Sequence, residues 1–301
     1  MREAMPKVSR VAVTMLALAV SAGAYATGEG EFEKTVPAEA RGAVDISNVS
    51  GTVVVMGWDR PEVSVRAQLA PGVERVDVTS DHGHTLVRVV LPHAGHGGET
   101  ELQVKVPKES EVDVSAVSAD VTSSGVLGVQ RLHTVSGEIV AEIAGSDIDA
   151  KSVSGDIKLK GHGQPARLRV NSVSGDVRLD HGAGDLEAGS VSGTLVVSLD
   201  SARSVRARST SGDLHFEGKL TRGADLDAST VSGNLNVRAS AEGGFNYEVS
   251  SFSGDITNCF GAEVIGHHHG PGHRLEGSRG DGAGRVYLKS MSGDIELCDR
   301  K

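Results

Sequence analysis

Aspartates recur directly after a glycine along much of this 301-residue chain. The repeated carboxylates are Asp156, Asp176, Asp213, Asp255 and Asp294. Carboxylates stacked at regular intervals could ligate Ca²⁺, a hard cation that prefers oxygen ligands. Serine and aspartate beside glycine are also common turn-capping residues, and Glu138, Thr194 and Asn234 interrupt the series. We therefore expect these carboxylates to cap turns rather than to form a metal site.

A second group with metal-binding chemistry is a histidine cluster, His267, His268, His269 and His273. Imidazoles can bind Zn²⁺, Ni²⁺ or Cu²⁺. Glycines surround this cluster, and no cysteine or supporting carboxylate is spaced to complete a rigid site. The pattern predicts a histidine-rich loop without a cofactor. The nearby tripeptide Arg279-Gly280-Asp281 matches an integrin-recognition motif, which chance explains in a chain rich in these three residues.

The two cysteines, Cys259 and Cys298, each lie five residues after a repeated glycine. If residues 261–284 form an insertion on one coil, the cysteines lie on adjacent strands about 5 Å apart, within disulfide range. If two coils separate them, the distance is about 10 Å and no bridge forms. The glycine-rich and histidine-rich composition of residues 261–284 favours the insertion, and hence a disulfide.

All these residues belong to an internal repeat with the signature Val-Ser-Gly-Asp or a close variant. Ala119 takes the place of the glycine in the first regular copy, and successive copies up to Gly254 follow at steps of 18 to 21 residues. The repeat glycines are Gly137, Gly155, Gly175, Gly193, Gly212, Gly233, Gly254 and Gly293. A period near 19 without helical patterning indicates a solenoid, in which each repeat stacks on the next.

Apolar residues alternate around each glycine with period two, which is typical of a strand with one buried face. We expect the residues two before and two after the glycine to point inward, and the glycine to lie where a side chain would crowd the axis or where the strand bends. An offset in the alternation at Val170-Asn171-Ser172-Val173 predicts a corner or bulge. The residues predicted inward before the glycine are Val135, Val153, Val173, Val191, Thr210, Val231, Phe252 and Met291.

The fold class predicted by this pattern is all-β, a single-chain parallel β-solenoid, or β-helix, with coils of about 19 residues. The repeats occupy residues 111–301, with the insertion at about 261–284. Residues 41–110 alternate less regularly and are interpreted as an irregular β region or N-terminal cap continuous with the solenoid. Residues 27–40 are interpreted as a linker.

Residues 1–26 have the features of a signal peptide: a positive start, an apolar stretch and the cleavage pattern Ala24-Tyr25-Ala26. No later stretch approaches the 18 or so apolar residues of a membrane span. We therefore expect an exported protein without a transmembrane segment after signal removal. It would lie in the periplasm, at the cell surface or outside the cell, where paired cysteines can oxidise.

Composition narrows the range of functions. The formal net charge is −10, which argues against nucleic acid as the main partner because phosphate binding needs a basic surface. The chain has 39 glycines but only nine aromatic residues, which fits a narrow aliphatic core. No unique cluster of acidic and basic residues breaks the repeat, and no nucleophile-elbow motif occurs in a strand-turn-helix context. We therefore expect no catalytic residues.

The Ser-Val-Ser-Gly-Asp copies, the stretch Val53 to Asp59 and the ending Met291 to Leu297 resemble a bacterial family of β-strand-repeat proteins labelled "putative adhesin" or domain of unknown function. The resemblance covers nearly all of the chain after the signal peptide. It implies envelope localisation and a surface-binding role.

Together these features lead to the hypothesis of a non-enzymatic exported envelope protein, an adhesin or scaffold. It would bind an envelope or cell-surface protein or glycan through the outer face of the solenoid. Two alternatives stay open: a polysaccharide-active β-helix enzyme, and a regulatory partner of an envelope-stress system.

Overall fold

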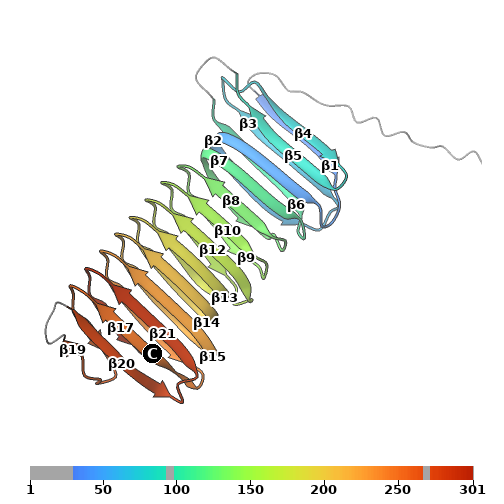
Figure 1. The fold of residues 1–301 in the computed structure, drawn as a ribbon. Helices are drawn as coiled ribbons and strands as arrows, with labels where there is room; N and C mark the ends of the chain where they lie inside the picture. Colours follow the sequence, from blue (N-terminus) through green and yellow to red (C-terminus); the bar gives the residue numbers. More distant parts are fainter. Residues whose placement is uncertain (1–29, 93–97, 267–271, 301) are drawn as a thin grey trace, which may run out of the picture.

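The computed structural model describes residues 30–92, 98–266 and 272–300, and every regular element within these ranges is a β-strand. The twenty-two strands in these ranges form one continuous hydrogen-bonded sheet. Most of them lie in a long stack of coils (Figure 1). The prediction of an all-β fold is confirmed. The predicted signal peptide lies outside the described residues, as do His267, His268 and His269.

The N-terminal part of the stack contains both parallel and antiparallel pairs. Its strands are β1 (Gly30–Pro37), β2 (Ala43–Trp58), β3 (Glu62–Leu69), β4 (Arg75–Asp81), β5 (His84–Val90) and β6 (Thr100–Pro107). β3 pairs antiparallel with β1 and β6, and β4 pairs antiparallel with β5. β2 pairs in parallel with β5 and β6, and also along most of its length with β7 (Glu111–Ser124). The β2–β7 ladder joins this region directly to the first regular coil.

The central coils each contribute two strand segments that pair in parallel with the same segments of the next coil. The strands are β8 (Gln130–Thr134), β9 (Ile139–Ile143), β10 (Ile148–Ser152), β11 (Ile157–Gly161), β12 (Ala166–Ser172), β13 (Val177–Ser190), β14 (Leu195–Ser209) and β15 (Leu214–Thr230). Ile148 pairs with Leu168 in one ladder, and Ile157 pairs with Val177 in the other. The inward rows of the two ladders pack together in a buried, mainly aliphatic core.

The C-terminal coils do not stack in sequence order. The remaining strands are β16 (Leu235–Ala241), β17 (Gly244–Ser251), β18 (Ile256–Asn258), β19 (Ile265–Gly266), β20 (His273–Gly280), β21 (Gly284–Ser290) and β22 (Ile295–Cys298). β21 pairs in parallel with β15 and with β17, and β22 pairs with β16 and β18. The last coil in the sequence therefore lies between the two that precede it (Figure 1). β20 pairs antiparallel with β17 and covers this end of the stack.

One part of the predicted strand pattern is wrong. The residues two before the glycine are exposed rather than inward, and the apolar ones range from 43 % exposure at Val173 to 57 % at Phe252. The strand instead ends at a buried hydroxyl residue three before the glycine, as at Ser152 in β10. The exposed set comprises Val135, Val153, Val173, Val191, Thr210, Val231, Phe252 and Met291.

A hydrogen bond explains this change of direction. The Ser152 hydroxyl oxygen accepts the backbone N–H of Gly155 at 2.8 Å, so that Val-Ser-Gly forms a capped turn between two strands. Val153 lies at the outside of that corner. The strand pattern resumes two residues after the glycine, where Ile157 is fully buried as predicted. The apolar alternation across the glycine therefore combines an exposed turn residue with a buried strand residue.

The repeat glycines are required by the spacing of the coils. A Cβ placed on Gly155 would lie 1.8 Å from the carbonyl oxygen of Gly137 in the preceding coil, and one on Gly193 would lie 2.0 Å from that of Gly175. The predicted crowding is confirmed, but its source is the backbone of the neighbouring coil.

Candidate binding surfaces of the coil stack

The repeated carboxylates link successive coils through backbone hydrogen bonds. Asp156 Oδ1 accepts the backbone N–H of Asp176 at 2.9 Å, and Asp213 Oδ1 accepts that of Asn234 at 2.8 Å. Asn234 Oδ1 in turn accepts the backbone N–H of Asp294 at 3.0 Å. Asp294 Oδ1 completes the series by accepting the N–H of Asp255 at 2.8 Å. An amide oxygen and a carboxylate oxygen thus have the same role, which supports the turn-capping interpretation of these residues.

The predicted insertion carries side chains with structural contacts. His273, at the start of β20, places Nδ1 2.9 Å from the carbonyl oxygen of Gly254. Arg279 forms an ion pair with Asp299, and its guanidinium lies 4.7 Å from the centre of the Phe260 ring. Asp281 is paired with Arg222 at 2.8 Å. Both charges of the integrin-like tripeptide are therefore engaged within the molecule.

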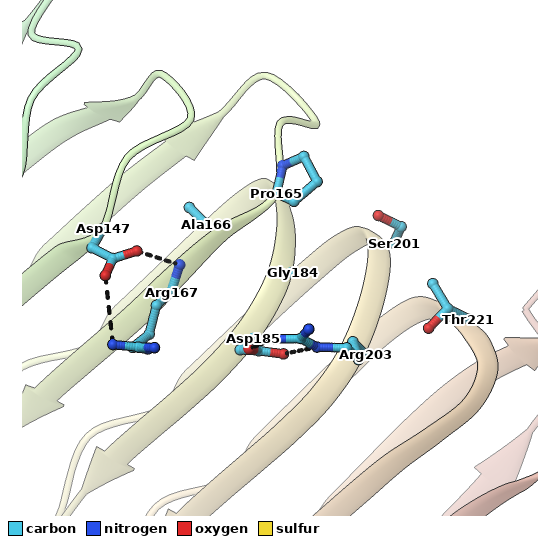
Figure 2. A pocket seen from close by; sticks show the side chains of 9 residues that line it. All are labelled: Asp147, Pro165, Ala166, Arg167, Gly184, Asp185, Ser201, Arg203 and Thr221. Atoms are coloured by element: carbon cyan, nitrogen blue, oxygen red, sulfur yellow. Dashed lines mark hydrogen bonds and ion pairs between the residues drawn. The ribbon is translucent and has the colours of Figure 1, made fainter.

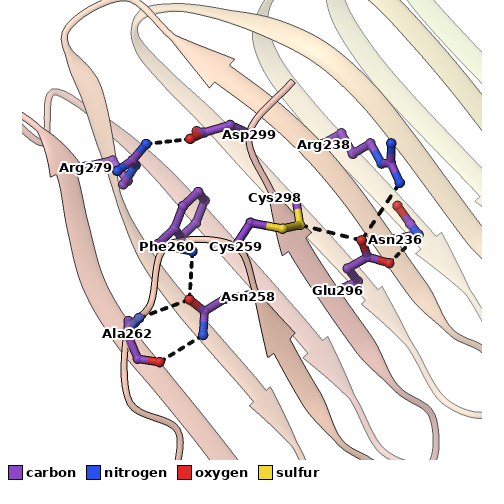
Figure 3. The surroundings of a disulfide bond; sticks show 10 residues. All are labelled: Asn236, Arg238, Asn258, Cys259, Phe260, Ala262, Arg279, Glu296, Cys298 and Asp299. Atoms are coloured by element: carbon purple, nitrogen blue, oxygen red, sulfur yellow. Dashed lines mark hydrogen bonds and ion pairs between the residues drawn. A yellow bond between two sulfur atoms is a disulfide. The ribbon is translucent and has the colours of Figure 1, made fainter. Parts of the chain in front are cut away.

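Cys259 and Cys298 form the predicted disulfide, with their Cα atoms 4.9 Å apart (Figure 3). Cys259 follows β18 and Cys298 ends β22, and these two strands are neighbours in the stack. The backbone N–H of Cys259 also donates to the carbonyl oxygen of Leu297 at 3.2 Å. The bond holds the final coil against the outermost one, which confirms the interpretation with a single inserted segment.

A groove of about 430 Å³ crosses the connections at the edge opposite the Val-Ser-Gly corners (Figure 2). We call it the far-edge groove. It is lined by Asp147, Pro165, Ala166, Arg167, Gly184, Asp185, Ser201, Arg203 and Thr221, which come from successive coils. The groove is open and contains both charges, hydroxyl groups and a proline. It suits a polar ligand that extends along the stack.

Ion pairs between successive coils fix the charged side chains of the far-edge groove. Asp147 Oδ1 accepts the backbone N–H of Arg167 at 3.0 Å, and its Oδ2 lies 3.7 Å from the Arg167 guanidinium. Arg203 donates through Nε to Asp185 at 2.9 Å and makes a second contact through its other nitrogen. The hydrogen bonds from Arg203 hold the pKa of the Asp185 carboxyl below its ordinary value. Both residues therefore stay charged in neutral solution.

The same arrangement recurs near the C-terminal end. Arg285 in β21 donates to both oxygens of Asp225 in β15, at 2.8 and 2.9 Å. This bidentate contact lowers the pKa of Asp225 and raises that of Arg285. Exposed pairs of this kind contribute little to stability, so their main effect here is to order the side chains on the outer face.

The sequence interpretation did not identify the far-edge groove. Its residues lie outside the Val-Ser-Gly-Asp signature, and its turns differ in length from coil to coil. The sequence did contain a signal for these ion pairs. Arg167 lies one repeat after Asp147, and Arg203 lies one repeat after Asp185, so each arginine is expected beside a carboxylate of the preceding coil. Among the described residues, no helix has the length and apolar character needed to cross a membrane.

Comparison with known proteins gives one family match. The family model described as Toastrack DUF4097 matches residues 74–298. No curated protein matches the chain.

Three solved structures share low sequence identity with this chain. A "putative cell adhesion protein" from Clostridium sporogenes is 10 % identical, with 90 % of this chain and 100 % of that chain covered and a TM-score of 0.27. A "putative adhesin" from Bacteroides fragilis is 11 % identical, with 89 % and 97 % covered and a TM-score of 0.41. A "putative lipid binding protein" from Parabacteroides distasonis is 10 % identical, with 90 % and 98 % covered and a TM-score of 0.46.

Proposed function

The chain belongs to the Toastrack DUF4097 family, and we propose that this member is a parallel β-solenoid that serves as a non-enzymatic, exported binding scaffold. The signal-peptide pattern of residues 1–26 supports export to the periplasm or cell surface. The Cys259–Cys298 disulfide fits the oxidising conditions of those compartments. The scaffold binds an envelope or cell-surface polymer, either a glycan or a protein, along its outer face.

The far-edge groove is the observation that supports this function best. Its aspartates and arginines alternate at the coil spacing of about 4.8 Å, so groups of one charge recur on every second coil and an extended polymer can contact more than one of them. Arg167 and Arg203 are held in place by carboxylates of the preceding coil, which lowers the entropy that must be lost on binding. Ser201 and Thr221 add hydroxyl groups at the same edge. An open polar groove of this kind suits binding of a polymer better than catalysis, for which the reacting bond would have to be enclosed.

The test is a screen of acidic and neutral glycans and of envelope extract, with both retention and cleavage measured. We expect the chain to retain at least one envelope polymer without turnover. The double variant Arg167→Ala/Arg203→Ala should lose retention by about ten-fold or more, as expected for removal of two central contacts. Arg66→Ala is the matched control, because Arg66 is an exposed arginine paired with Glu33 at 3.0 Å in the N-terminal region.

Each outcome separates the alternatives. Turnover of any glycan would overturn the non-enzymatic assignment in favour of a polysaccharide-active enzyme. Equal retention by the double variant and the Arg66→Ala control would exclude the far-edge groove as the binding site. Failure to retain any envelope polymer would contradict the scaffold function itself.

A further inference from the structure

A continuous row of exposed side chains runs along the Val-Ser-Gly edge of the stack. We call it the apolar ridge. In stack order it comprises Val49, Val117, Val135, Val153, Val173, Val191, Thr210, Val231, Met291 and Phe252. Its nine apolar members are 38–57 % exposed, and they account for nine of the twelve exposed large hydrophobic side chains in the described part of the chain. Exposed apolar surface gathered in one strip marks an interaction site.

Backbone hydrogen bonds make the ridge continuous from coil to coil. The carbonyl oxygen of Val135 accepts the N–H of Ser154 at 2.8 Å, and that of Val153 accepts the N–H of Ser174 at 2.9 Å. The series reaches the C-terminal end, where Met291 accepts from Ser253 at 3.0 Å. Nine steps of about 4.8 Å give the ridge a length of about 43 Å. The core does not require apolar residues here, because Thr210 occupies the same position in one coil.

Two polar columns border the ridge. The residues four before the glycine form the basic flank, and the residues one after it form the acidic flank. The basic flank consists of Ser47, Ser115, His133, Lys151, Asn171, Gly189, Arg208, Ser229, Lys289 and Ser250. The acidic flank consists of Thr52, Asp120, Glu138, Asp156, Asp176, Thr194, Asp213, Asn234, Asp294 and Asp255.

Three cations of the basic flank, Lys151, Arg208 and Lys289, lie level with carboxylates of the acidic flank, whereas Asp120, Asp176 and Asp255 have no cation at their level. The four coils with a basic flank residue, His133, Lys151, Arg208 and Lys289, carry the carboxylates Glu138, Asp156, Asp213 and Asp294 on the other side of the ridge. The three coils with an uncharged acidic-flank residue, Thr52, Thr194 and Asn234, are also uncharged on the basic flank, at Ser47, Gly189 and Ser229. A partner that faces both flanks at the same level therefore meets one charge of each sign at the levels of Lys151, Arg208 and Lys289.

Several of these charged side chains form no ion pair within the described part of the chain. Arg208 and Lys289 form no ion pair with any described residue, and neither do Asp213 and Asp294. The arginines of the far-edge groove, by contrast, are paired with the preceding coil. Arg208, Lys289, Asp213 and Asp294 can thus form ion pairs with another molecule, whereas Lys151 and Glu138 are already paired with Asp149 and Lys158.

A groove of about 500 Å³ lies between the ridge and the basic flank. Val191 and Val231 form one wall, and Arg208 and Lys289 lie on the other side. Gly189 lies on the same side as Arg208 and has no side chain to narrow the groove. A second row of valines with the same spacing fits into such a groove, because its side chains repeat at the same distance of about 4.8 Å.

The direction of the two-fold axis determines which flanks of two copies face each other across the apolar ridge. If the two-fold axis runs along the stack, the partner's stack is parallel, and the basic flank of each copy faces the acidic flank of the other. Each ridge then lies in the groove of the other copy, at the same level. If the two-fold axis crosses the stack, like flanks face each other. Arg208 then opposes Lys151, and Asp213 and Asp294 oppose Asp156 and Asp120. Charge complementarity therefore selects the parallel arrangement.

We propose that the apolar ridge is the interface through which two copies of this chain form a parallel, two-fold symmetric dimer. A contact about 43 Å long needs a width of only about 18 Å to bury the roughly 800 Å² per partner that is typical of stable complexes. The edge of two packed layers, about 10 Å apart between backbones and widened by side chains, provides that width. The dimer leaves both far-edge grooves on its outer sides and does not depend on the proposed polymer.

The first test measures the mass of the full exported chain by sedimentation equilibrium. We expect a dimer, and we expect Val173→Lys/Val191→Lys to raise its dissociation constant by about ten-fold or more. Val140→Lys is the matched control, because Val140 is 37 % exposed on the broad face of β9 and should leave the dimer intact. Thermal melting checks that each variant is folded. A monomeric native chain, or a ridge variant that dimerises as the native chain does, would overturn the proposal.

A second test distinguishes the two orientations by cysteine cross-linking. In the parallel dimer Val231 faces Val231 of the other copy, so the single variant Val231→Cys should form a covalent dimer under mild oxidation. In an antiparallel dimer Val231 lies opposite Val135, and only a mixture of Val135→Cys and Val231→Cys chains would cross-link. Val140→Cys serves as the control. Cross-linking confined to the mixture would overturn the parallel arrangement.

A lipid surface is the alternative partner for the apolar ridge. Vesicles of neutral and anionic phospholipid test for it. Capture of a monomeric chain by vesicles, lost in Val173→Lys/Val191→Lys, would replace the second copy with a lipid surface. Retention of envelope polymers by this ridge variant is measured in parallel. We expect the ridge variant to retain polymer as the native chain does. For the native chain, retention without dimerisation would refute the dimer alone, whereas dimerisation without retention would refute only the proposed polymer binding.

Discussion

Ser152 and Val153 are neighbours in the sequence, yet the serine side chain is 5 % exposed and the valine side chain is 45 % exposed. The polar residue is buried because its hydroxyl caps the turn, and the apolar residue is directed to solvent by that turn. Seven other coils place a serine or threonine at the buried position: Thr134, Ser172, Ser190, Ser209, Thr230, Ser251 and Ser290. The motif therefore combines a structural hydroxyl with an exposed apolar residue.

Ser172→Ala should destabilise the chain by about 1–3 kcal/mol. The Ser172 hydroxyl oxygen accepts the N–H of Gly175 at 3.0 Å, and its removal leaves a buried donor without a partner. Denaturant unfolding measures the change. Ser172→Thr should be nearly neutral, because Thr134 and Thr230 cap the equivalent glycines in other coils. The exposed neighbour provides the control, and Ser174→Ala should change stability by less than about 0.5 kcal/mol. Equal effects of Ser172→Ala and Ser174→Ala would contradict the capping role.

Gly193→Ala should be strongly destabilising, by about 3 kcal/mol or more. The added Cβ would lie 2.0 Å from the carbonyl oxygen of Gly175, so the two coils would have to separate. Gly266→Ala is the control, because a Cβ there meets no atom within 4 Å. Thermal melting of both variants measures the difference. An unchanged melting temperature for Gly193→Ala would show that the coil spacing is not limited by this contact.

The sequence was sufficient to predict those features that follow from spacing and alternation. Ile157 and Leu159 are buried because they alternate within one strand, and the repeat length alone places them beside their counterparts. Val153 was misassigned because a turn residue, a glycine and a strand residue happened to share the same parity. The capping role of Ser152 distinguishes the two cases, and it depends on a three-dimensional contact.

The order of the coils and the far-edge groove could not be predicted in the same way. β21 pairs with both β15 and β17, although nothing in a short repeat specifies which equivalent repeat becomes its neighbour. Long-range topology decides that choice. Arg203 and Asp185 form part of the groove because turns of unequal length bring them together, and the motif alignment does not include those turns.

Reduction of Cys259–Cys298 should lower the stability of the C-terminal end. The two residues are separated by 39 positions, and closing a loop of this size contributes roughly 4 kcal/mol in the chain-entropy model. Unfolding with and without reductant measures the loss, and the variant Cys259→Ser/Cys298→Ala should be insensitive to reductant. Two free thiols in the unreduced native chain would contradict the pairing.

Stability should fall in acid because two carboxylates are held charged by arginine. The pKa values of Asp185 and Asp225 are lowered by hydrogen bonds from Arg203 and Arg285. A carboxyl with a lower pKa in the folded state contributes stability above its unfolded pKa of about 3.9, and this contribution is lost as the pH falls through the lower folded value. We expect a flat denaturation midpoint from neutral pH to about 5 and a decline below about 4.

The control for this pH dependence is the variant Asp185→Asn/Asp225→Asn. It removes both shifted groups while it keeps the shape of the side chains, so the decline in acid should be shallower than in the native chain. Because both pairs are largely exposed, the difference should be small. If the variant loses stability in acid as steeply as the native chain does, the loss is due to carboxylates other than Asp185 and Asp225.

Salt should weaken the proposed dimer, and the sign of this effect reports its orientation. In the parallel arrangement the basic flank with Arg208 and Lys289 faces the acidic flank with Asp213 and Asp294, and added salt screens that attraction. In an antiparallel arrangement like charges face each other, so salt would strengthen association. Sedimentation equilibrium at low and high ionic strength measures the dissociation constant.

Arg208→Gln/Lys289→Gln should weaken the dimer at low salt and reduce its salt dependence, while the apolar ridge maintains association at high salt. If salt tightened the native dimer more than the Arg208→Gln/Lys289→Gln dimer, the parallel arrangement would be excluded, because this difference isolates the flank charges from the overall negative charge of each chain.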